Sequence, residues 1–156
     1  MDSLHGVFFP DSILSSPSGA RDEDLLERYT VLRHRMAQHD RTQIALNSNS
    51  GLILLKLRRF GEAYEAFRRA QDAAKALPDA QALLAAVHLN MAVAAEAEHG
   101  PEKADAKISF ELEQAWALLS GLPKGTVPAD LARRCADCFD YFGYFLYAGA
   151  LRRQNE

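Results

Sequence analysis

The sequence predicts an all-α fold of about six or seven helices that pair into antiparallel hairpins. Apolar and small residues recur every three or four positions through most of the chain, which is the period of one helix face. Gly and Pro punctuate the breaks between these runs. Because one hairpin cannot bury its apolar faces alone, we expect hairpins of the same kind to stack on each other.

Composition and charge exclude several classes of protein. The chain of 156 residues is 48% hydrophobic and 25% charged, as in a soluble globular domain of ordinary size. The formal net charge of −3, with arginine pairs scattered among acids, predicts no nucleic-acid partner. No apolar run approaches the roughly 18–20 residues of a membrane span, and residues 1–3 lack the basic start of a secretory signal. We therefore expect a cytoplasmic protein without membrane insertion.

The chain divides into an irregular N-terminal tail, residues 1–20, and a helical domain, residues 21–156. Ser, Pro and Gly are frequent in the tail, but it also holds two apolar islands, at residues 7–9 and 13–14. Such islands either dock back on the helices, which we favour, or form a short linear segment that binds a partner.

Two helices are predicted at the start of the helical domain. The first runs from residue 21 to about residue 39, with acidic side chains at 22–24, where the helix dipole favours them. Thr42 is a candidate cap for the second helix, which covers about residues 43–58.

A third helix, residues 62–77, completes the central hairpin. Gly61 suits a tight turn between the two helices of this hairpin, and Pro78 ends the third helix. The inward face of this helix is predicted at Ala63, Ala66, Phe67, Ala70, Ala73, Ala74 and Leu77.

The next hairpin is built around an alanine-rich central helix. Residues 80–98 combine strong helix propensity with small side chains, which predicts close packing on both sides. The break at 99–102 places Pro101 at the first position of the partner helix, which covers about residues 102–119.

A loop at 120–128 precedes one last helix, predicted from Ala129 to Arg153. Six aromatic residues in this helix lie too close together to share one face, so one side packs inward and the other meets the tail or a partner. These residues are Phe139, Tyr141, Phe142, Tyr144, Phe145 and Tyr147.

The central hairpin also carries a family pattern. The spacing of its small and aromatic residues resembles the packing positions of a tetratricopeptide repeat. Asn47 and Ser50 depart from that pattern, because Trp and Leu are frequent at these positions. The matching residues are Gly51, Leu54, Phe60, Ala63, Phe67 and Ala70.

Weaker copies of this pattern follow. A shift of 41 residues aligns Gly51 with Ala92 and Phe67 with Ile108, but it pairs Ala70 with Glu111, a mismatch. This step resembles the long-helix variety found in kinesin light chains and in bacterial peptide-sensing regulators. The resemblance covers about residues 41–151 and implies a short right-handed superhelix. A third, partial copy begins at Phe139, Phe142, Gly143 and Leu146.

The resemblance also implies a concave groove lined by the first helix of each hairpin. Asparagine side chains in such a groove can pair with the backbone of a bound peptide, a role that suits Asn49 and Asn90. The family's clamp for a terminal carboxylate is not reproduced, and the alternative is that these residues only pack helix on helix. The expected protein-binding residues are Asn49, Leu52, Lys56, Asn90, Val93, Glu96, Asp140, Tyr144 and Tyr147.

No catalytic, cofactor-binding or metal-binding residues are expected. Cys135 and Cys138 form a single C-x-x-C inside a predicted helix, without the further ligands of a zinc site or the preceding strand of a redox motif. We expect two reduced, partly buried thiols. His88 is expected to be a packed or hydrogen-bonded core histidine. The chain is therefore not expected to be an enzyme.

The function predicted from these features is a non-enzymatic adaptor or scaffold. It would bind a protein or peptide segment through its groove or through the aromatic C-terminal helix. One alternative is an obligate subunit of a complex or homo-oligomer, with the last helix as a permanent interface. Another is suggested by a resemblance to the secretion chaperones of bacterial type III systems, although the 41-residue step and the alanine-rich centre do not favour it.

Overall fold

The computed structural model describes residues 5–9, 21–36 and 41–154. All regular secondary structure within these residues is helical, which confirms the all-α prediction. The described part of the chain forms seven helices: α1 (Asp22–Arg35), α2 (Arg41–Lys56), α3 (Phe60–Lys75), α4 (Gln81–Lys103), α5 (Asp105–Ser120), α6 (Ala129–Tyr141) and α7 (Phe145–Gln154).

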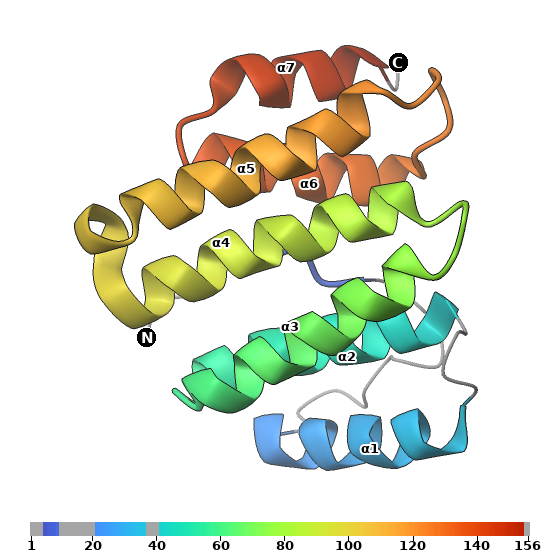
Figure 1. Ribbon diagram of the computed structural model, residues 1–156, viewed down its shortest axis with the longest axis vertical. Coiled ribbons are helices and arrows are strands. Elements are labelled where there is room, and N and C mark those ends of the chain that lie inside the picture. Colours follow the sequence, from blue (N-terminus) through green and yellow to red (C-terminus); the bar gives the residue numbers. More distant parts are fainter. Residues whose placement is uncertain (1–4, 10–20, 37–40, 155–156) are drawn as a thin grey trace.

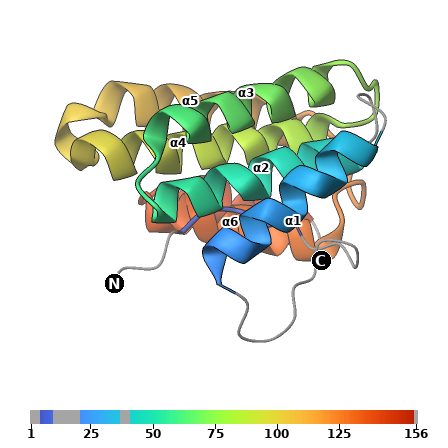
Figure 2. The same cartoon turned by 90° about the horizontal axis from the view of Figure 1, so that it is seen from below.

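Consecutive helices pair, and the pairs stack. Helices α2 and α3, α4 and α5, and α6 and α7 pack against each other, while α3 and α4 join the first two pairs. Figure 1 shows the resulting order, from α1 at one end of the long axis to α7 at the other. Figure 2 shows α3 and α5 on one side of this stack and α2 and α6 on the other. The handedness of the stack stays a prediction.

Helix α2 is the most deeply buried helix in the described chain. It contacts α1, α3 and α4, so all but one of its residues from 43 to 55 are buried. A close approach to α3 occurs at Gly51, where an added Cβ would lie 2.5 Å from Cε1 of Phe67. The Phe67 ring is fully buried. Gly51 therefore allows the two helices to meet.

The turn between α2 and α3 differs from the prediction. Arg58, not Gly61, takes the left-handed conformation, with φ 58°. The N–H of Arg59 donates to the carbonyl of Leu54 at 2.9 Å and that of Arg58 to Leu55 at 3.0 Å, which is the Schellman pattern of a helix end. Gly61 lies in the first turn of α3 instead. Glycine is common in the left-handed conformation, but other residues can adopt it too. The prediction therefore placed the turn at Gly61 instead of at Arg58.

The predicted break between α4 and α5 is present. Gly100 leaves the helical conformation, with φ 84° and ψ 162°, and Pro101 follows it as the start of one further turn. Helix α5 then begins at Asp105 rather than at about residue 102. The mismatched residue Glu111 of α5 has a partner here, because its Oε1 lies 3.2 Å from Nδ1 of the buried His88 on α4.

The single last helix predicted from 129 to 153 is wrong. The chain turns at Gly143, φ 82°, and the N–H of Tyr144 donates to the carbonyl of Phe139 at 2.9 Å in a second Schellman turn. Helices α6 and α7 thus form a complete third hairpin. Gly143 is the turn of this hairpin and not, as the third copy of the repeat assumed, a small residue inside a first helix.

Candidate functional site

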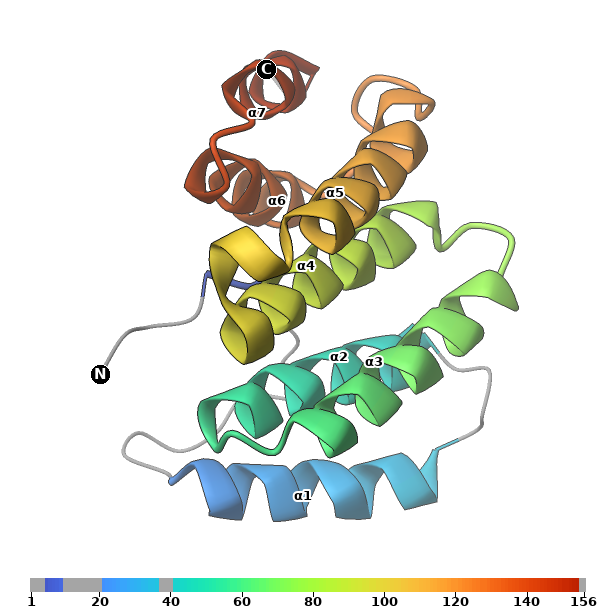
Figure 3. The same cartoon turned by 60° about the vertical axis from the view of Figure 1, so that its left-hand side comes forward.

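An extended stretch of the tail lies against the first helices of the hairpins. The island at 7–9 therefore docks on the helices, as predicted, whereas the island at 13–14 is outside the described residues. Figure 3 shows residues 5–9, in dark blue, beside α4 and α6. The hydrogen bonds of this stretch define the candidate site.

Asn90 of α4 holds both polar groups of one backbone residue. Its Oδ1 accepts the N–H of Val7 at 2.6 Å, and its Nδ2 donates to the carbonyl of Val7 at 3.0 Å. The same Nδ2 donates to Oγ of Ser48 on α2 at 2.8 Å. Val7, Ser48 and Asn90 are all buried. These hydrogen bonds therefore fix the Asn90 amide in the orientation that binds the backbone of Val7.

Asn49 of α2 repeats this arrangement two residues further along the segment. Its Oδ1 accepts the N–H of Phe9 at 2.9 Å, and its Nδ2 donates to the carbonyl of Phe9 at 3.2 Å. In an extended chain, alternate residues direct their backbone groups to the same side. Two asparagines on neighbouring first helices therefore match the two-residue period of the segment.

The other end of the segment reaches the third hairpin. The ring of His5 stacks on Tyr141 at the end of α6, with ring centroids 3.9 Å apart and an angle of 12° between the planes. The Tyr141 hydroxyl in turn donates to Glu96 of α4. His5, Val7 and Phe9 thus contact α6, α4 and α2 in order, one alternate residue for each hairpin.

Side-chain burial adds a sequence preference to this backbone pairing. Val7 is 0% exposed and Phe9 is 5% exposed, while Phe8 between them is only partly buried. At Gly6 an added Cβ would lie 2.5 Å from Cδ2 of Leu52 and 3.0 Å from Oδ1 of Asn90. The site therefore accommodates a glycine at position 6, a buried aliphatic residue at position 7 and a buried aromatic residue at position 9. Position 8 accepts side chains of different kinds.

The free energies that hold and oppose this segment are similar in size. Its four backbone hydrogen bonds contribute about 1 kcal/mol each. The two buried side chains contribute about 1.5–3 kcal/mol each. Ordering five backbone residues costs about 5–10 kcal/mol. The gains therefore exceed the cost by at most a few kcal/mol, so the loss of one buried contact is enough to release the segment.

Three of the nine expected protein-binding residues meet at this segment. Asn49 and Asn90 bind its backbone, and Leu52 is the side chain closest to Gly6. Glu96 lies beside them through its hydrogen bond from Tyr141, and Val93 is buried on the same helix. His5 and Gly6 were missed, although the apolar island that follows them in the tail was a signal for docking.

The other four expected residues make different contacts. Lys56 lies 3.6 Å from Asp22 of α1, and Asp140 pairs with Arg152 of α7 at 2.6 Å. Tyr144 lies in the turn between α6 and α7, and its hydroxyl donates to Ser109 at 3.2 Å. Tyr147 is on α7, the second helix of its hairpin, and not on a first helix as the groove assignment required.

Tyr147 belongs to an aromatic cluster between α5 and the last hairpin. Its ring stacks on Trp116 with centroids 4.7 Å apart, and its hydroxyl donates to Oε2 of Glu113 at 2.9 Å. This hydrogen bond raises the pKa of Tyr147. Phe139 meets the same two rings edge to face. The cluster therefore joins the third hairpin to α5.

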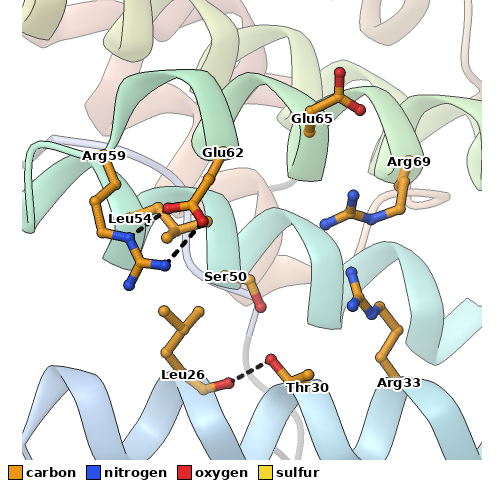
Figure 4. A pocket seen from close by; sticks show the side chains of 9 residues that line it. All are labelled: Leu26, Thr30, Arg33, Ser50, Leu54, Arg59, Glu62, Glu65 and Arg69. Carbon is orange, nitrogen blue, oxygen red and sulfur yellow. Dashed lines mark hydrogen bonds and ion pairs between the residues drawn. The ribbon is translucent and has the colours of Figure 1, made fainter.

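A separate pocket of about 310 Å³ opens between α1, α2 and α3 (Figure 4). The guanidinium groups of Arg33 and Arg69 face each other across it, and burial together with the charge of Arg33 lowers the pKa of Arg69. Such a pair suits a carboxylate or phosphate. Glu62 and Glu65 line the same pocket, however, so its net positive charge is small. The contacts of residues 5–9 with Asn49 and Asn90 define the better-resolved candidate site.

The two cysteine thiols lie inside the folded domain. Cys135 and Cys138 are free and buried, and burial raises the pKa of Cys135 to about 12 and the pKa of Cys138 as well. Within the described ranges, no three His, Cys, Asp or Glu side chains gather as a metal site. None of the described helices has both the length and the apolar character needed to cross a membrane.

Comparison with known proteins does not assign the chain to a family. No protein-family model, no curated protein and no solved structure matches it.

Proposed function

We propose that this protein is a non-enzymatic adaptor of the cytoplasm that holds an extended segment of another protein in its groove. The observation that carries this proposal is the pair of buried asparagines, Asn49 and Asn90, each bound to both backbone groups of one residue in residues 5–9. The resemblance to tetratricopeptide repeats agrees with this proposal and is part of it.

Asn49 and Asn90 recognise the backbone of an extended segment rather than its side chains. A primary amide offers one acceptor and one donor, which match the N–H and C=O of a single residue. Every non-proline residue carries these two groups. Asn49 and Asn90 therefore recognise any extended segment that presents alternate residues at their spacing, while neighbouring apolar contacts select among sequences.

Selection from a random peptide-display library tests the proposal. The target is the full chain with Val7→Asp and Phe9→Asp, which place charges at the two buried side chains of the tail and so free the groove. We expect enriched peptides with apolar residues at alternate positions. We also expect that Asn49→Ala with Asn90→Ala in the same target abolishes their binding. Enrichment of the same peptides on both targets, or of none on either, contradicts the proposal.

A second candidate function rests on α7. Phe145 is 67% exposed and Leu146 is 86% exposed, and both are large apolar side chains at the start of the last helix. They favour the alternative in which α7 is a permanent interface with another subunit or a second copy. Light scattering of the purified chain over a concentration series tests the case of a second copy. A monomer that becomes a dimer with concentration, and no longer does so after Phe145→Ser and Leu146→Ser, supports the interface.

A further inference from the structure

We propose that the partner segment copies the pattern of residues 6–9, and that residues 5–9 compete with it for the groove from within the same chain. The pattern is a glycine, an aliphatic residue, a tolerant position and an aromatic residue. This inference rests on the proposed function, because it names the partner and the regulation of the same groove.

The glycine position follows from the space at Gly6. An added Cβ there meets Leu52, a fully buried side chain, at 2.5 Å, and the Oδ1 atom of Asn90 at 3.0 Å. Asn90, which also holds Val7 and Ser48, would have to give by only a few tenths of an ångström, but the Leu52 methyl group would have to shift within the buried core. A partner segment in this register therefore needs glycine immediately before the residue that Asn90 binds.

The next positions follow from burial. Val7 is completely enclosed and Phe9 nearly so, whereas Phe8 retains access to solvent. A charge at either enclosed position would lose its hydration without gaining a partner. A polar residue at the position of Phe8 keeps contact with water. The partner is thus selected at alternate positions, which are the same positions whose backbone the asparagines hold.

Residues 5–9 compete with a partner segment because they are covalently connected to the helices that form the groove. Residues 5–9 belong to the chain that forms the groove, so their effective concentration there is of millimolar order, as for other short connections. A partner segment that binds with micromolar affinity must displace them. The wild-type groove is therefore occupied by default, and an event that captures or modifies the tail exposes it.

A peptide-binding assay with the full chain tests this inference. The probe is a fluorescent peptide of residues 4–11, and the proteins are the wild type, the Val7→Asp/Phe9→Asp chain and a Gly6→Val chain. We expect both variants to bind the peptide, and the wild type to bind it at least about tenfold more weakly because its own segment competes. A peptide with Gly6→Val or Val7→Asp should lose binding, whereas one with Phe8→Ser should keep it within about threefold.

The outcomes distinguish the two proposals. Equal binding by wild type and variants overturns the competition. If a tail variant binds library peptides but not the peptide of residues 4–11, the partner pattern is overturned and the adaptor function stands. Failure of both kinds of peptide overturns both. Thermal melts recorded by circular dichroism provide the remaining check: if both tail variants unfold, residues 5–9 are an inseparable part of the core and the inference is wrong.

Discussion

The side-chain amide of Asn90 forms a closed pair of hydrogen bonds with the backbone of Val7, 83 residues earlier in the chain. It joins an extended segment to the buried side of a central helix and does so without using the identity of the Val7 side chain. The stability of this contact can be measured directly.

Asn90→Ala should detach residues 5–9 and weaken the fold. The change removes the partner of the Val7 N–H and C=O and of Ser48, so we expect the free energy of unfolding to fall by about 1–3 kcal/mol. Urea unfolding measures this loss, and hydrogen exchange should show that the amides of Val7 and Phe9 lose protection. Gln114→Ala on the exposed face of α5 is the control and should stay within about 0.5 kcal/mol. Unchanged protection in Asn90→Ala would show that the pair does not hold the segment.

Gly51→Ala should destabilise the first hairpin. The new methyl group would overlap the buried Phe67 ring, and overpacking of this kind costs about 1–3 kcal/mol. Gly61→Ala is the matched control, because Gly61 lies in α3 with open space around its Cβ position. There the gain in helix propensity should stabilise the fold by at most about 0.5–1 kcal/mol, which is the gain expected in the middle of a helix. Thermal melts compare the two, and the same shift for both contradicts the assigned packing.

His88 and Glu111 should depend on each other. Glu111 is 1% exposed, and among the described residues its second carboxylate oxygen has no hydrogen-bond partner, although Nζ of Lys107 lies 3.6 Å away. His88→Leu removes its nearest partner, and breaking a buried pair in this way costs about 3–5 kcal/mol. Adding Glu111→Leu should recover most of that loss, because two apolar side chains of similar volume need no partner. A double-mutant cycle by urea unfolding measures the coupling, and additive losses would show that the contact is not an energetic pair.

The buried thiols should make the fold sensitive to high pH. In the unfolded chain a cysteine loses its proton near pH 8.5. Burial raises the pKa of Cys135 to about 12 and also raises that of Cys138. Above about pH 8.5 the folded state therefore binds more protons than the unfolded state, and stability falls with rising pH by at most about 1.4 kcal/mol per unit for each thiol.

Urea unfolding at pH 7.5, 9.5 and 10.5 measures this dependence. The chain with Cys135→Ala and Cys138→Ala should lose less stability over this range than the wild type does, whatever its stability at pH 7.5. Equal slopes for the two proteins would refute the assignment of the alkaline loss to the thiols.

Local patterns predicted most of the fold, because helix periodicity is a property of neighbouring residues. Helices α1 to α5 lie within a few residues of their predicted bounds. The errors occurred at turns, where Arg58 and Gly143 adopt positive φ. Apolar residues continue on both sides of Gly143, so periodicity alone could not divide α6 from α7. Arginine has no preference for the left-handed conformation that Arg58 adopts, so the residue type gave no signal for this turn.

The site was only partly predictable for a related reason. A resemblance named Asn49 and Asn90 as residues able to bind a backbone, and composition marked the island at 7–9. The pairing of these asparagines with residues 7–9 depends on two stacked hairpins being in place, which no local pattern encodes. Similarly, Glu111 looked like a mismatch in the repeat because its partner His88 comes from the preceding helix.

The path of residues 5–9 also has a consequence for synthesis on the ribosome. Val7 emerges 83 residues ahead of Asn90, which at about 5–20 residues per second is a wait of roughly 4 to 17 seconds. The stretch that α2, α4 and α6 finally enclose is therefore made before any of these helices exists. Throughout that interval Val7, Phe8 and Phe9 are accessible to chaperones. Residues 5–9 are enclosed only after the helices have folded.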